Sequence, residues 1–378
     1  MIELIAEYVN ELTGWQWLRM FSFVSVRAGL ALAFAFVTSV ALGPMVIRRL
    51  QAMKLRQPIK RFEGENSVQM PESHLSKEGT PSMGGVLILF SMTAAALLFC
   101  RLDNPMLWAL LVLVLGFGMI GLLDDLEKAL FWNARGLKAR TKLILQTVLA
   151  GLFALWASYG FKNVDYYYMM NLDASRTLFF PFFKEWAFYL GVFYVPLATL
   201  VIVGASNSVN LTDGLDGLAI GVSTMVAVAF AVMAYLIGRV DFAEYLIVPH
   251  VRGASELCVL LCGFIGAGLG FLWFNSNPAS VFMGDTGALA IGALFGGVAV
   301  LLKQEIILAI IGGVFVFECL SVILQVTSFR LWRRRVFLMS PFHHHLQKLG
   351  WAESKIIVRM WIVSLLLALL GLSTLKIR

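Results

Sequence analysis

Long apolar runs recur along this chain, separated by shorter polar segments. A membrane-spanning helix needs about 20 predominantly apolar residues. The pattern therefore predicts about ten transmembrane helices, near residues 22–47, 84–101, 106–123, 143–160, 186–205, 217–237, 256–274, 284–302, 306–329 and 356–375. We expect an all-α polytopic integral membrane protein that forms a single transmembrane domain over residues 1–378.

Composition supports a membrane class. Hydrophobic residues make up 59% of the chain and charged residues only 14%, whereas about a quarter of a soluble domain is charged. The four cysteines all lie in apolar runs and form no CxxC pair, so we expect small buried side chains rather than a zinc site or disulfides. These are Cys100, Cys258, Cys262 and Cys319.

The N-terminal segment does not resemble a secretory signal. A signal peptide has a basic region before its apolar run. This segment instead carries the acidic residues Glu3, Glu7 and Glu11. Trp15 and Trp17 precede the first predicted span, where aromatic residues commonly anchor a helix at the membrane interface.

The basic residues predict topology rather than nucleic-acid binding. The formal net charge is +7, but no basic and aromatic strip resembles a nucleic-acid surface. Lysine and arginine are concentrated in the connections after the first, third and ninth spans, which the positive-inside rule places in the cytoplasm. Both termini are then periplasmic. The basic residues of these connections are Arg48, Arg49, Lys54, Arg56, Lys60, Arg61 and Lys77; Lys128, Arg135, Lys138, Arg140 and Lys142; and Arg330, Arg333, Arg334, Arg335, Lys348 and Lys355.

Four polar motifs fall on this same cytoplasmic face. The pair Asp124–Asp125 ends the third span, and NSVNLTDGLDG, FNSNPASVFMGDTG and SPFHHHLQKLG follow the fifth, seventh and ninth spans. The topology was assigned from lysine and arginine, whereas these motifs are mostly acids, amides and histidines. Their convergence on one face therefore predicts one active site there.

The acids and amides suggest a magnesium or phosphate site. Adjacent helical residues point about 100° apart, so one of Asp124 and Asp125 is expected to face the site and the other to orient it; a solvated helix end is the plainer alternative. Amide and carboxylate oxygens suit hydrated Mg²⁺ or a sugar-nucleotide head group.

The NSVNLTDGLDG segment carries polar residues at intervals of three, which keeps successive side chains neighbours on a helix. They are Asn207, Asn210, Asp213 and Asp216. The flexible Gly214 would let this segment turn closely onto a ligand, although a polar turn with an Asp cap would look similar.

The later motifs add further candidates. FNSNPASVFMGDTG offers Asn275, Phe282 and Asp285, and Asp285 could be either a metal ligand or a helix cap. His343, His344 and His345 are adjacent, which disfavours chelation of one ion and favours phosphate contact or structural hydrogen bonding.

Basic and intramembrane polar residues remain more ambiguous. Lys77 and Ser82 in KEGTPSMGG could contact phosphates, or Lys77 could simply be solvated. Lys128 lies one turn beyond Asp124, and Lys142 could be a snorkelling interfacial lysine. Glu318 and Gln325 share one stripe of the ninth span, and at membrane depth Glu318 should be paired or protonated.

These motifs together resemble the phospho-N-acetylmuramoyl-pentapeptide transferase (MraY) family of the polyprenyl-phosphate N-acetylhexosamine-1-phosphate transferases. The resemblance covers nearly the whole chain, through KEGTPSMGG, GLLDD, GLKARTK, NSVNLTDGLDGLA, FNSNPASVFMGD and SPFHHHLQKLGW. The unbroken HHH run favours the muramyl-pentapeptide branch. Leu126 departs from the aromatic residue that the family often has there, and the segments around residues 61–75 and 161–186 look long.

The resemblance implies a reaction. UDP-MurNAc-pentapeptide and undecaprenyl phosphate would give lipid I and UMP in peptidoglycan biosynthesis at the bacterial inner membrane, with Mg²⁺ as cofactor. It implies Asp285 as the magnesium ligand and Asp124 as general base, or as nucleophile in a two-step scheme. Other implied active-site positions are Asp125, Lys128, Lys142, Asn275 and His344; Asp213, Gly214 and Asp216 near the uridine and metal; and Lys77 and Ser82 on the nucleotide side. Asn207, Asn210, Phe282, Gln325, His343 and His345 complete the candidate substrate-binding set.

The mechanism that we expect is direct attack by an ionised lipid-phosphate oxygen on the β-phosphorus of the sugar nucleotide, with UMP leaving. The nearest alternative is a related enzyme that transfers N-acetylglucosamine-1-phosphate. An ion-coupled transporter is a more remote alternative, because it should place its polar groups near the midplane. Nucleic acid is not an expected partner, and a homodimer is left open.

Overall fold

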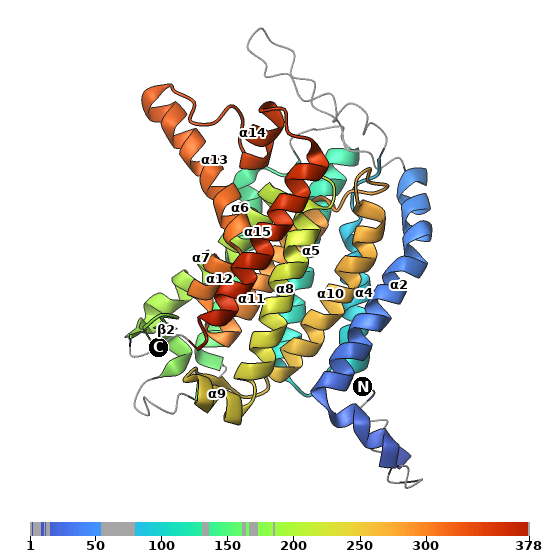
Figure 1. The fold of residues 1–378 in the computed structure, drawn as a ribbon, viewed down its shortest axis with the longest axis vertical. Coiled ribbons are helices and arrows are strands. Elements are labelled where there is room, and N and C mark those ends of the chain that lie inside the picture. Colours follow the sequence, from blue (N-terminus) through green and yellow to red (C-terminus); the bar gives the residue numbers. More distant parts are fainter. Residues whose placement is uncertain are drawn as a thin grey trace.

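The computed structural model describes residues 2, 9–10, 12, 16–53, 80–130, 136–160, 164–165, 173–183 and 186–376. Lys77, Trp15 and most of the polar segment after the first span lie outside these residues. Within them the protein is an all-α bundle of roughly parallel helices (Figure 1), with strands confined to short pairs at one end. The fold class predicted from hydropathy is confirmed.

In the part of the chain that the structure describes, ten helices of at least 15 residues form the bundle. In chain order they are α2 (Val24–Ala52), α4 (Gly85–Phe99), α5 (Pro105–Leu130), α6 (Ala139–Leu155), α7 (Tyr194–Thr212), α8 (Leu218–Ile237), α10 (Ser255–Asn275), α11 (Gly284–Leu302), α13 (Gly313–Trp332) and α15 (Glu353–Ser373). Among the described residues, nine helical segments are long and apolar enough to cross a membrane. The span predicted at 84–101 corresponds to α4, which has 15 residues and falls short of that length.

Short elements connect the bundle. They are the helical turns η1 (Gln16–Ser22), η2 (Trp156–Gly160), η3 (Ala174–Arg176) and η4 (Gly191–Phe193); the helices α9 (Val240–Leu246), α12 (Glu305–Ile311) and α14 (Phe342–Lys348); and the strands β1 (Val164–Asp165), β2 (Thr177–Phe179), β3 (Ala187–Tyr189) and β4 (His250–Val251). The antiparallel pairs are β1 with β4 and β2 with β3, so part of the long outer loop expected near residues 161–186 is a hairpin.

Two predicted boundaries were wrong in an informative way. The span placed at 306–329 is two helices, α12 and α13, which meet at the glycine pair Gly312–Gly313. Hydropathy is continuous across that break, so periodicity did not reveal it. The span placed at 186–205 begins at residue 191 and runs to Thr212. Asn207 and Asn210 therefore lie in the last turns of α7 rather than beyond it.

Helix α11 occupies the centre of the bundle. Nearly all of its side chains from Thr286 to Leu302 are buried, and it packs against α5, α7, α4 and α8. Glycines allow these close contacts: a Cβ on Gly292 would lie 2.4 Å from the backbone oxygen of Ala205 in α7. Small residues at such interfaces let membrane helices approach closely.

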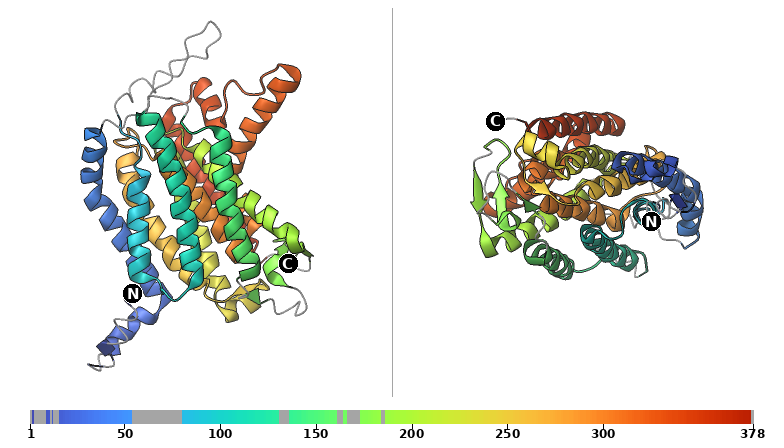
Figure 2. Two further views of the ribbon diagram at one scale, coloured as in Figure 1. Left: turned by 180° about the vertical axis from the view of Figure 1, so that it is seen from behind. Right: turned by 90° about the horizontal axis from the view of Figure 1, so that it is seen from below.

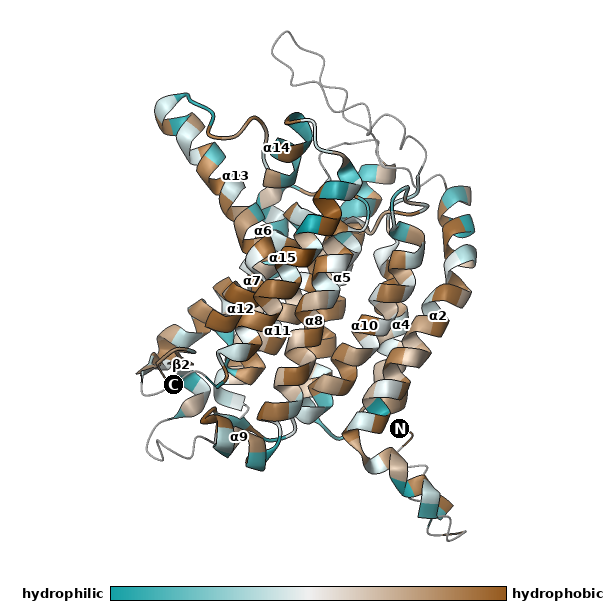
Figure 3. Cartoon of the chain, in the orientation of Figure 1, coloured by the Kyte–Doolittle hydropathy of each residue, from teal (hydrophilic) through white to brown (hydrophobic). Residues whose placement is uncertain are grey.

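The two ends of the bundle differ in what they carry. The start of α2 and the end of α15 lie at one end, together with α9 and the β2–β3 hairpin, whereas α14 and the tip of α13 lie at the other (Figure 1, Figure 2). Hydrophobic residues occupy the middle of the helices and polar residues gather toward both ends (Figure 3). This arrangement agrees with the prediction that both termini face the side opposite the basic connections.

Candidate active site

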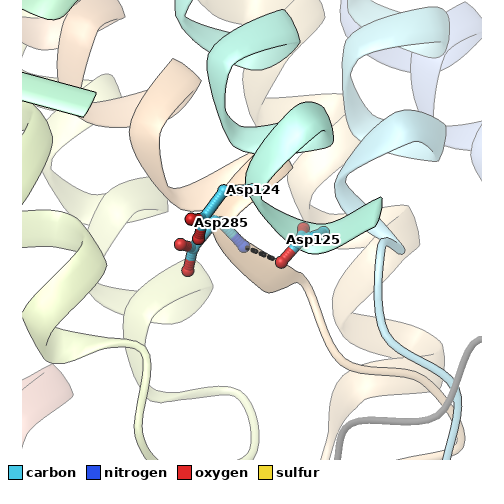
Figure 4. Close-up of side chains that lie close together, drawn as sticks. All are labelled: Asp124, Asp125 and Asp285. Carbon is cyan, nitrogen blue, oxygen red and sulfur yellow. Dashed lines mark hydrogen bonds between the residues drawn. The ribbon is translucent and has the colours of Figure 1, made fainter. Parts of the chain in front are cut away.

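Three carboxylates from two helices meet at the α14 end of the bundle. Asp124 and Asp125 project from α5, and Asp285 lies at the start of α11. One oxygen of each lies within 4.8 Å of the others. Figure 4 shows the Asp124 and Asp285 side chains next to each other, while Asp125 turns toward the Asp285 backbone. Two of the motifs that the sequence placed on one face therefore share one site.

Glycines bring these carboxylates together. A Cβ on Gly121 would lie 2.2 Å from the backbone oxygen of Asp285, so only glycine lets α5 approach the start of α11 this closely. Gly136 has a positive φ of +59°, and a Cβ there would lie 2.6 Å from Asp124 Oδ1. The next residue, Leu137, donates its amide to that same oxygen at 2.8 Å.

The two acids of the pair have different contacts. Asp125 caps the first turn of α11: Oδ1 accepts from the Asp285 amide at 3.2 Å, and Oδ2 accepts from the Thr286 amide and hydroxyl at 3.0 and 2.8 Å. A carboxylate in this position satisfies unpaired amides and favours the positive end of the helix dipole. Asp125 therefore fixes the backbone that carries Asp285, and Asp124 remains beside the Asp285 side chain.

Two lysines neutralise the acids. Lys128 Nζ lies 2.6 Å from Asp124 Oδ2 and 2.9 Å from Asp285 Oδ2. Lys142 Nζ lies 2.7 Å from the same Asp285 oxygen and 3.6 Å from Asp124. The Asn210 amide of α7 donates to the other oxygen, Asp285 Oδ1, at 2.8 Å. Lys142 thus points into the site, whereas the sequence had left a snorkelling role open.

Asp213 lies just beyond the end of α7, in the loop that continues to Gly217. Burial, followed by the negative charge of Asp285 and of other nearby carboxylates, raises the pKa of Asp213 from 3.8 to about 8. Asp213 therefore lies close enough to feel the charge of Asp285, although the two residues are distant in the sequence. The helical spacing predicted for the whole Asn207–Asp216 segment holds only as far as Thr212.

The neighbouring candidates hold loops in place. Asp216 Oδ2 accepts from the Ala279 amide at 3.1 Å. Asn275 accepts from the Gly217 amide at 3.0 Å and donates to the Val281 carbonyl at 2.8 Å. Asn207, one turn before Asn210, donates to Gln146 of α6 at 2.9 Å. These side chains tie the loop after α7 and the loop before α11 to each other and to α6.

Ser82 and Phe282 belong to two backbone segments that run together beside the acids. The Phe282 amide donates to the Pro81 carbonyl, and Phe282 in turn accepts from the Gly84 amide, at 2.9 and 2.8 Å. A Cβ on Gly284, whose φ is +73°, would lie 2.8 Å from Ser82 Oγ and 2.6 Å from Asp125 Oδ2. The Ser82 hydroxyl and the Asp125 carboxylate therefore lie on the same side of Gly284.

The histidine motif forms the first turn of α14. His343 is fully buried against Glu318 of α13, with Nδ1 3.2 Å from Glu318 Oε2. His344 Nδ1 lies 2.8 Å from Gln347 Oε1, and His345 Nδ1 accepts from the Leu338 amide at 3.2 Å. Gln325 of α13 contacts the backbone of Val336 and Phe337. The intramembrane Glu318 is thus paired, as its depth required.

The donor set fits a hard divalent cation. Carboxylate and amide oxygens are the ligands such ions prefer, and Asp124, Asp125 and Asp285 present oxygens within 4.8 Å of one another. The ammonium groups of Lys128 and Lys142 both contact Asp285 Oδ2, which shows that this position favours positive charge. Both oxygens of Asp125 accept from groups of α11, whereas the Asp124 and Asp285 side chains lie next to each other (Figure 4).

Comparison with known families agrees with this geometry. The model of glycosyl transferase family 4 matches residues 107–303, which is more than half of the 378 residues. This chain belongs to glycosyl transferase family 4. The phospho-N-acetylmuramoyl-pentapeptide-transferase signature 1 also matches, at residues 77–89.

The two matches together support a phosphosugar transferase of peptidoglycan synthesis, in a multi-pass membrane protein. The family uses a divalent metal, a nucleotide-sugar substrate and a polyprenyl phosphate acceptor. The matched region includes α5, α7, α10 and α11, and therefore the helices that carry the acid cluster.

Several residues that build the site were not among the sequence candidates. Thr286 and the glycines Gly121 and Gly136 hold the acids in place, and Glu353 of α15 accepts from the Asp216 amide at 3.1 Å. The glycines lie within GLLDD and RGLKAR, directly beside the candidate motifs. That proximity was a usable signal, whereas nothing in the local sequence pointed to Glu353.

Proposed function

We propose that this protein transfers phospho-MurNAc-pentapeptide from UDP-MurNAc-pentapeptide to undecaprenyl phosphate, giving lipid I and UMP, at the bacterial inner membrane. The observation that carries the proposal is the meeting of Asp124, Asp285, Lys128 and Lys142 at one end of an apolar bundle. The signature at residues 77–89 supports the muramyl-pentapeptide branch. Residues 1–378 would form one transferase domain, since the buried apolar residues from α2 to α15 form one cluster.

Charge neutralisation is the main chemical demand of this reaction. Phosphoryl transfer depends on positioning and electrostatic stabilisation more than on covalent chemistry. In our proposal Lys128 and Lys142 leave Asp285 to hold phosphate oxygens of the two substrates. A Mg²⁺ ion held by Asp285 would neutralise negative charge on the diphosphate and on the UMP leaving group. Asn210 and the Asp125 cap keep the Asp285 carboxylate in place.

The lipid phosphate is the nucleophile. One of its oxygens forms a bond to the β-phosphorus of the sugar nucleotide, and the bond from that phosphorus to the UMP oxygen breaks. Asp124 either accepts the residual proton of the lipid phosphate or orients it. A phosphate with a second pKa of about 6 is mostly dianionic at pH 7, so base catalysis contributes little. We therefore propose that Asp124 acts mainly by holding Lys128, from which its Oδ2 lies 2.6 Å.

The remaining candidates would bind substrate around this centre. Asp213, Gly214 and Asp216 are proposed to face the uridine, and Ser82, Phe282 and Lys77 the nucleotide side. His344 and His345 at the start of α14, with Gln325, would contact the phosphates or the sugar. Asn207 and Asn275 are proposed to support this set through the loop contacts described above.

A substrate comparison tests the proposal. Purified protein in detergent should release UMP from UDP-MurNAc-pentapeptide only when undecaprenyl phosphate is present, and should leave UDP-N-acetylglucosamine unchanged. Release from UDP-N-acetylglucosamine instead would assign the chain to the related N-acetylglucosamine-1-phosphate branch. No release from either sugar nucleotide, by protein that remains folded, would contradict the proposed function.

A further inference from the structure

Glu318 is a fully buried acid within the candidate membrane span Gly313–Trp332. Its carboxylate accepts from the backbone amide of His343 at 3.2 Å, and its Oε2 lies 3.2 Å from His343 Nδ1. An ionisable group at this depth is costly unless it is paired and is commonly retained for a role. Glu318 therefore holds the His343 backbone amide and lies directly against the ring.

The opposite edge of the His343 ring faces Gly214. A Cβ on Gly214 would lie 2.3 Å from His343 Nε2 and 3.0 Å from Cε1, so the ring fills the space that a side chain there would need. Within the described part of the chain, neither Nδ1 nor Nε2 makes a hydrogen bond, and the ring meets Glu318 through the 3.2 Å approach of Nδ1 to Oε2. The ring is fully buried. His343 is thus wedged between α13 and the loop after α7, out of reach of a substrate.

That loop leads to the acid cluster. It begins at Asp213, whose carboxyl is close enough for the charge of Asp285 to raise its pKa. It ends at Gly217, whose amide donates to Asn275, the last residue of α10. A displacement of Gly214 would therefore move Asp213 relative to Asp285. The other two histidines differ, because the side chains of His344 and His345 are partly exposed.

We propose that Glu318 and His343 form a positioning pair that holds the Asp213–Gly217 loop against the active site, and that His343 does not itself contact substrate. The pair links α13 and α14 to the loop after α7. Its structural part stands on the contacts above, and only its effect on turnover rests on the proposed function.

Hydrogen exchange tests the structural part without any substrate. Amide exchange should be measured by mass spectrometry on the full chain in detergent, comparing wild type with Glu318→Ala, His343→Ala and the double variant. We expect peptides covering residues 213–217 to exchange at least about tenfold faster in each single variant, because a local unit loses its support. The double variant should exchange no faster than the singles, because contacting residues are non-additive.

Ser328→Ala is the matched control. Ser328 is also a buried polar residue of α13, and its hydroxyl donates to the Arg334 carbonyl at 2.9 Å, away from Gly214. In Ser328→Ala, amides in peptides covering residues 213–217 should exchange at the wild-type rate. If the alanine variants do not fold, Glu318→Gln and Gly214→Ala replace them, because the first keeps the shape of the acid and the second displaces the ring directly.

Kinetics separate positioning from a general structural role. UMP release should fall on the order of a hundredfold in kcat for His343→Ala, as expected for misplaced groups, while the melting temperature stays near that of Ser328→Ala. Unchanged exchange at 213–217, uniform acceleration across the bundle, or additive effects in the double variant would overturn the proposal. If the exchange pattern is as expected but the wild type releases no UMP, the positioning pair stands and the proposed function fails.

Discussion

Asp285 is the residue on which the other groups of the site converge. Lys128, Lys142 and Asn210 contact its side chain, and Asp125 holds its backbone amide. In this state two ammonium groups neutralise a carboxylate that would otherwise be costly to bury. In the proposed mechanism the same lysines bind substrate phosphates, which would couple substrate binding to the release of Asp285 for a cation.

Asp213 should make the stability of the folded protein depend on pH. Its pKa of about 8 in the folded protein exceeds its ordinary value of 3.8. Between these values the folded chain holds a proton that the unfolded chain has lost, so raising the pH through this window favours unfolding. We expect the melting temperature of wild type in detergent, without divalent cations, to fall more steeply from pH 5 to pH 8 than that of Asp213→Asn, by differential scanning fluorimetry.

The matched control for this change is Asp103→Asn, which removes an exposed acid between α4 and α5. It should leave the wild-type slope unaltered. Identical slopes for wild type and Asp213→Asn would show that Asp213 keeps no proton in this window.

The residue scale also shows what sequence could predict. Asp124 and Asp285 were expected on one face from charge topology and motif spacing, and the structure brings them into one cluster. The division of labour between Asp124 and Asp125 followed from helical geometry, but which acid caps α11 depended on packing between helices. Lys142 could not be assigned beforehand, because a lysine at a helix start has the same local pattern whether it snorkels or points inward.

At the scale of elements, the contact between α5 and α11 builds the site. These helices pack closely because Gly121 faces the backbone of Asp285. Helix α13 differs, since it leans away from the bundle toward the α14 end (Figure 1). Its start at Gly313 follows directly on α12, and a glycine pair permits such a change of direction. The sequence pattern predicted one span here because both helices are apolar.

Gly121→Ala should separate α5 from α11. The added Cβ would meet the Asp285 backbone oxygen at 2.2 Å, and backbone cannot move aside cheaply. We expect UMP release to fall on the order of a hundredfold, measured on protein that still elutes as a folded species from size exclusion.

Gly204→Ala provides the comparison, because a Cβ at Gly204 in α7 has nothing within 4 Å. That variant should keep its activity and gain a little stability, up to about 1 kcal/mol from the better helix propensity of alanine. Near-normal turnover of Gly121→Ala would contradict the requirement for close packing at this point.

At the scale of the whole molecule, the candidate site lies at one end of the bundle. The acid cluster and the HHH turn lie at the end to which the basic connections belong, whereas the β2–β3 hairpin and α9 lie at the opposite end (Figure 1). Hydropathy and basic residues predicted this layout well, because the bilayer imposes both patterns on the sequence. They could not predict the pairing of β1 with β4, which joins segments about 85 residues apart in the chain.

Cysteine accessibility tests this orientation. In a variant with the four native cysteines replaced, Asp241→Cys in α9 should react with a membrane-impermeant maleimide in intact cells. Arg334→Cys, beyond the end of α13, should react only after permeabilisation. Both positions are exposed in the structure. Labelling of Arg334→Cys in intact cells, with Asp241→Cys protected, would invert the topology and place the acids on the outer face.

The central claim is that acids distant in the chain converge on a divalent cation that serves phosphosugar transfer. The most direct test is a Mg²⁺ titration of UMP release from UDP-MurNAc-pentapeptide and undecaprenyl phosphate, for wild type and for Asp285→Asn. We predict that wild type saturates with Mg²⁺ and loses activity with chelator, and that folded Asp285→Asn loses turnover by about a thousandfold, the scale of removing a key electrostatic group. Near-normal release by Asp285→Asn with the wild-type dependence on Mg²⁺ would contradict the account.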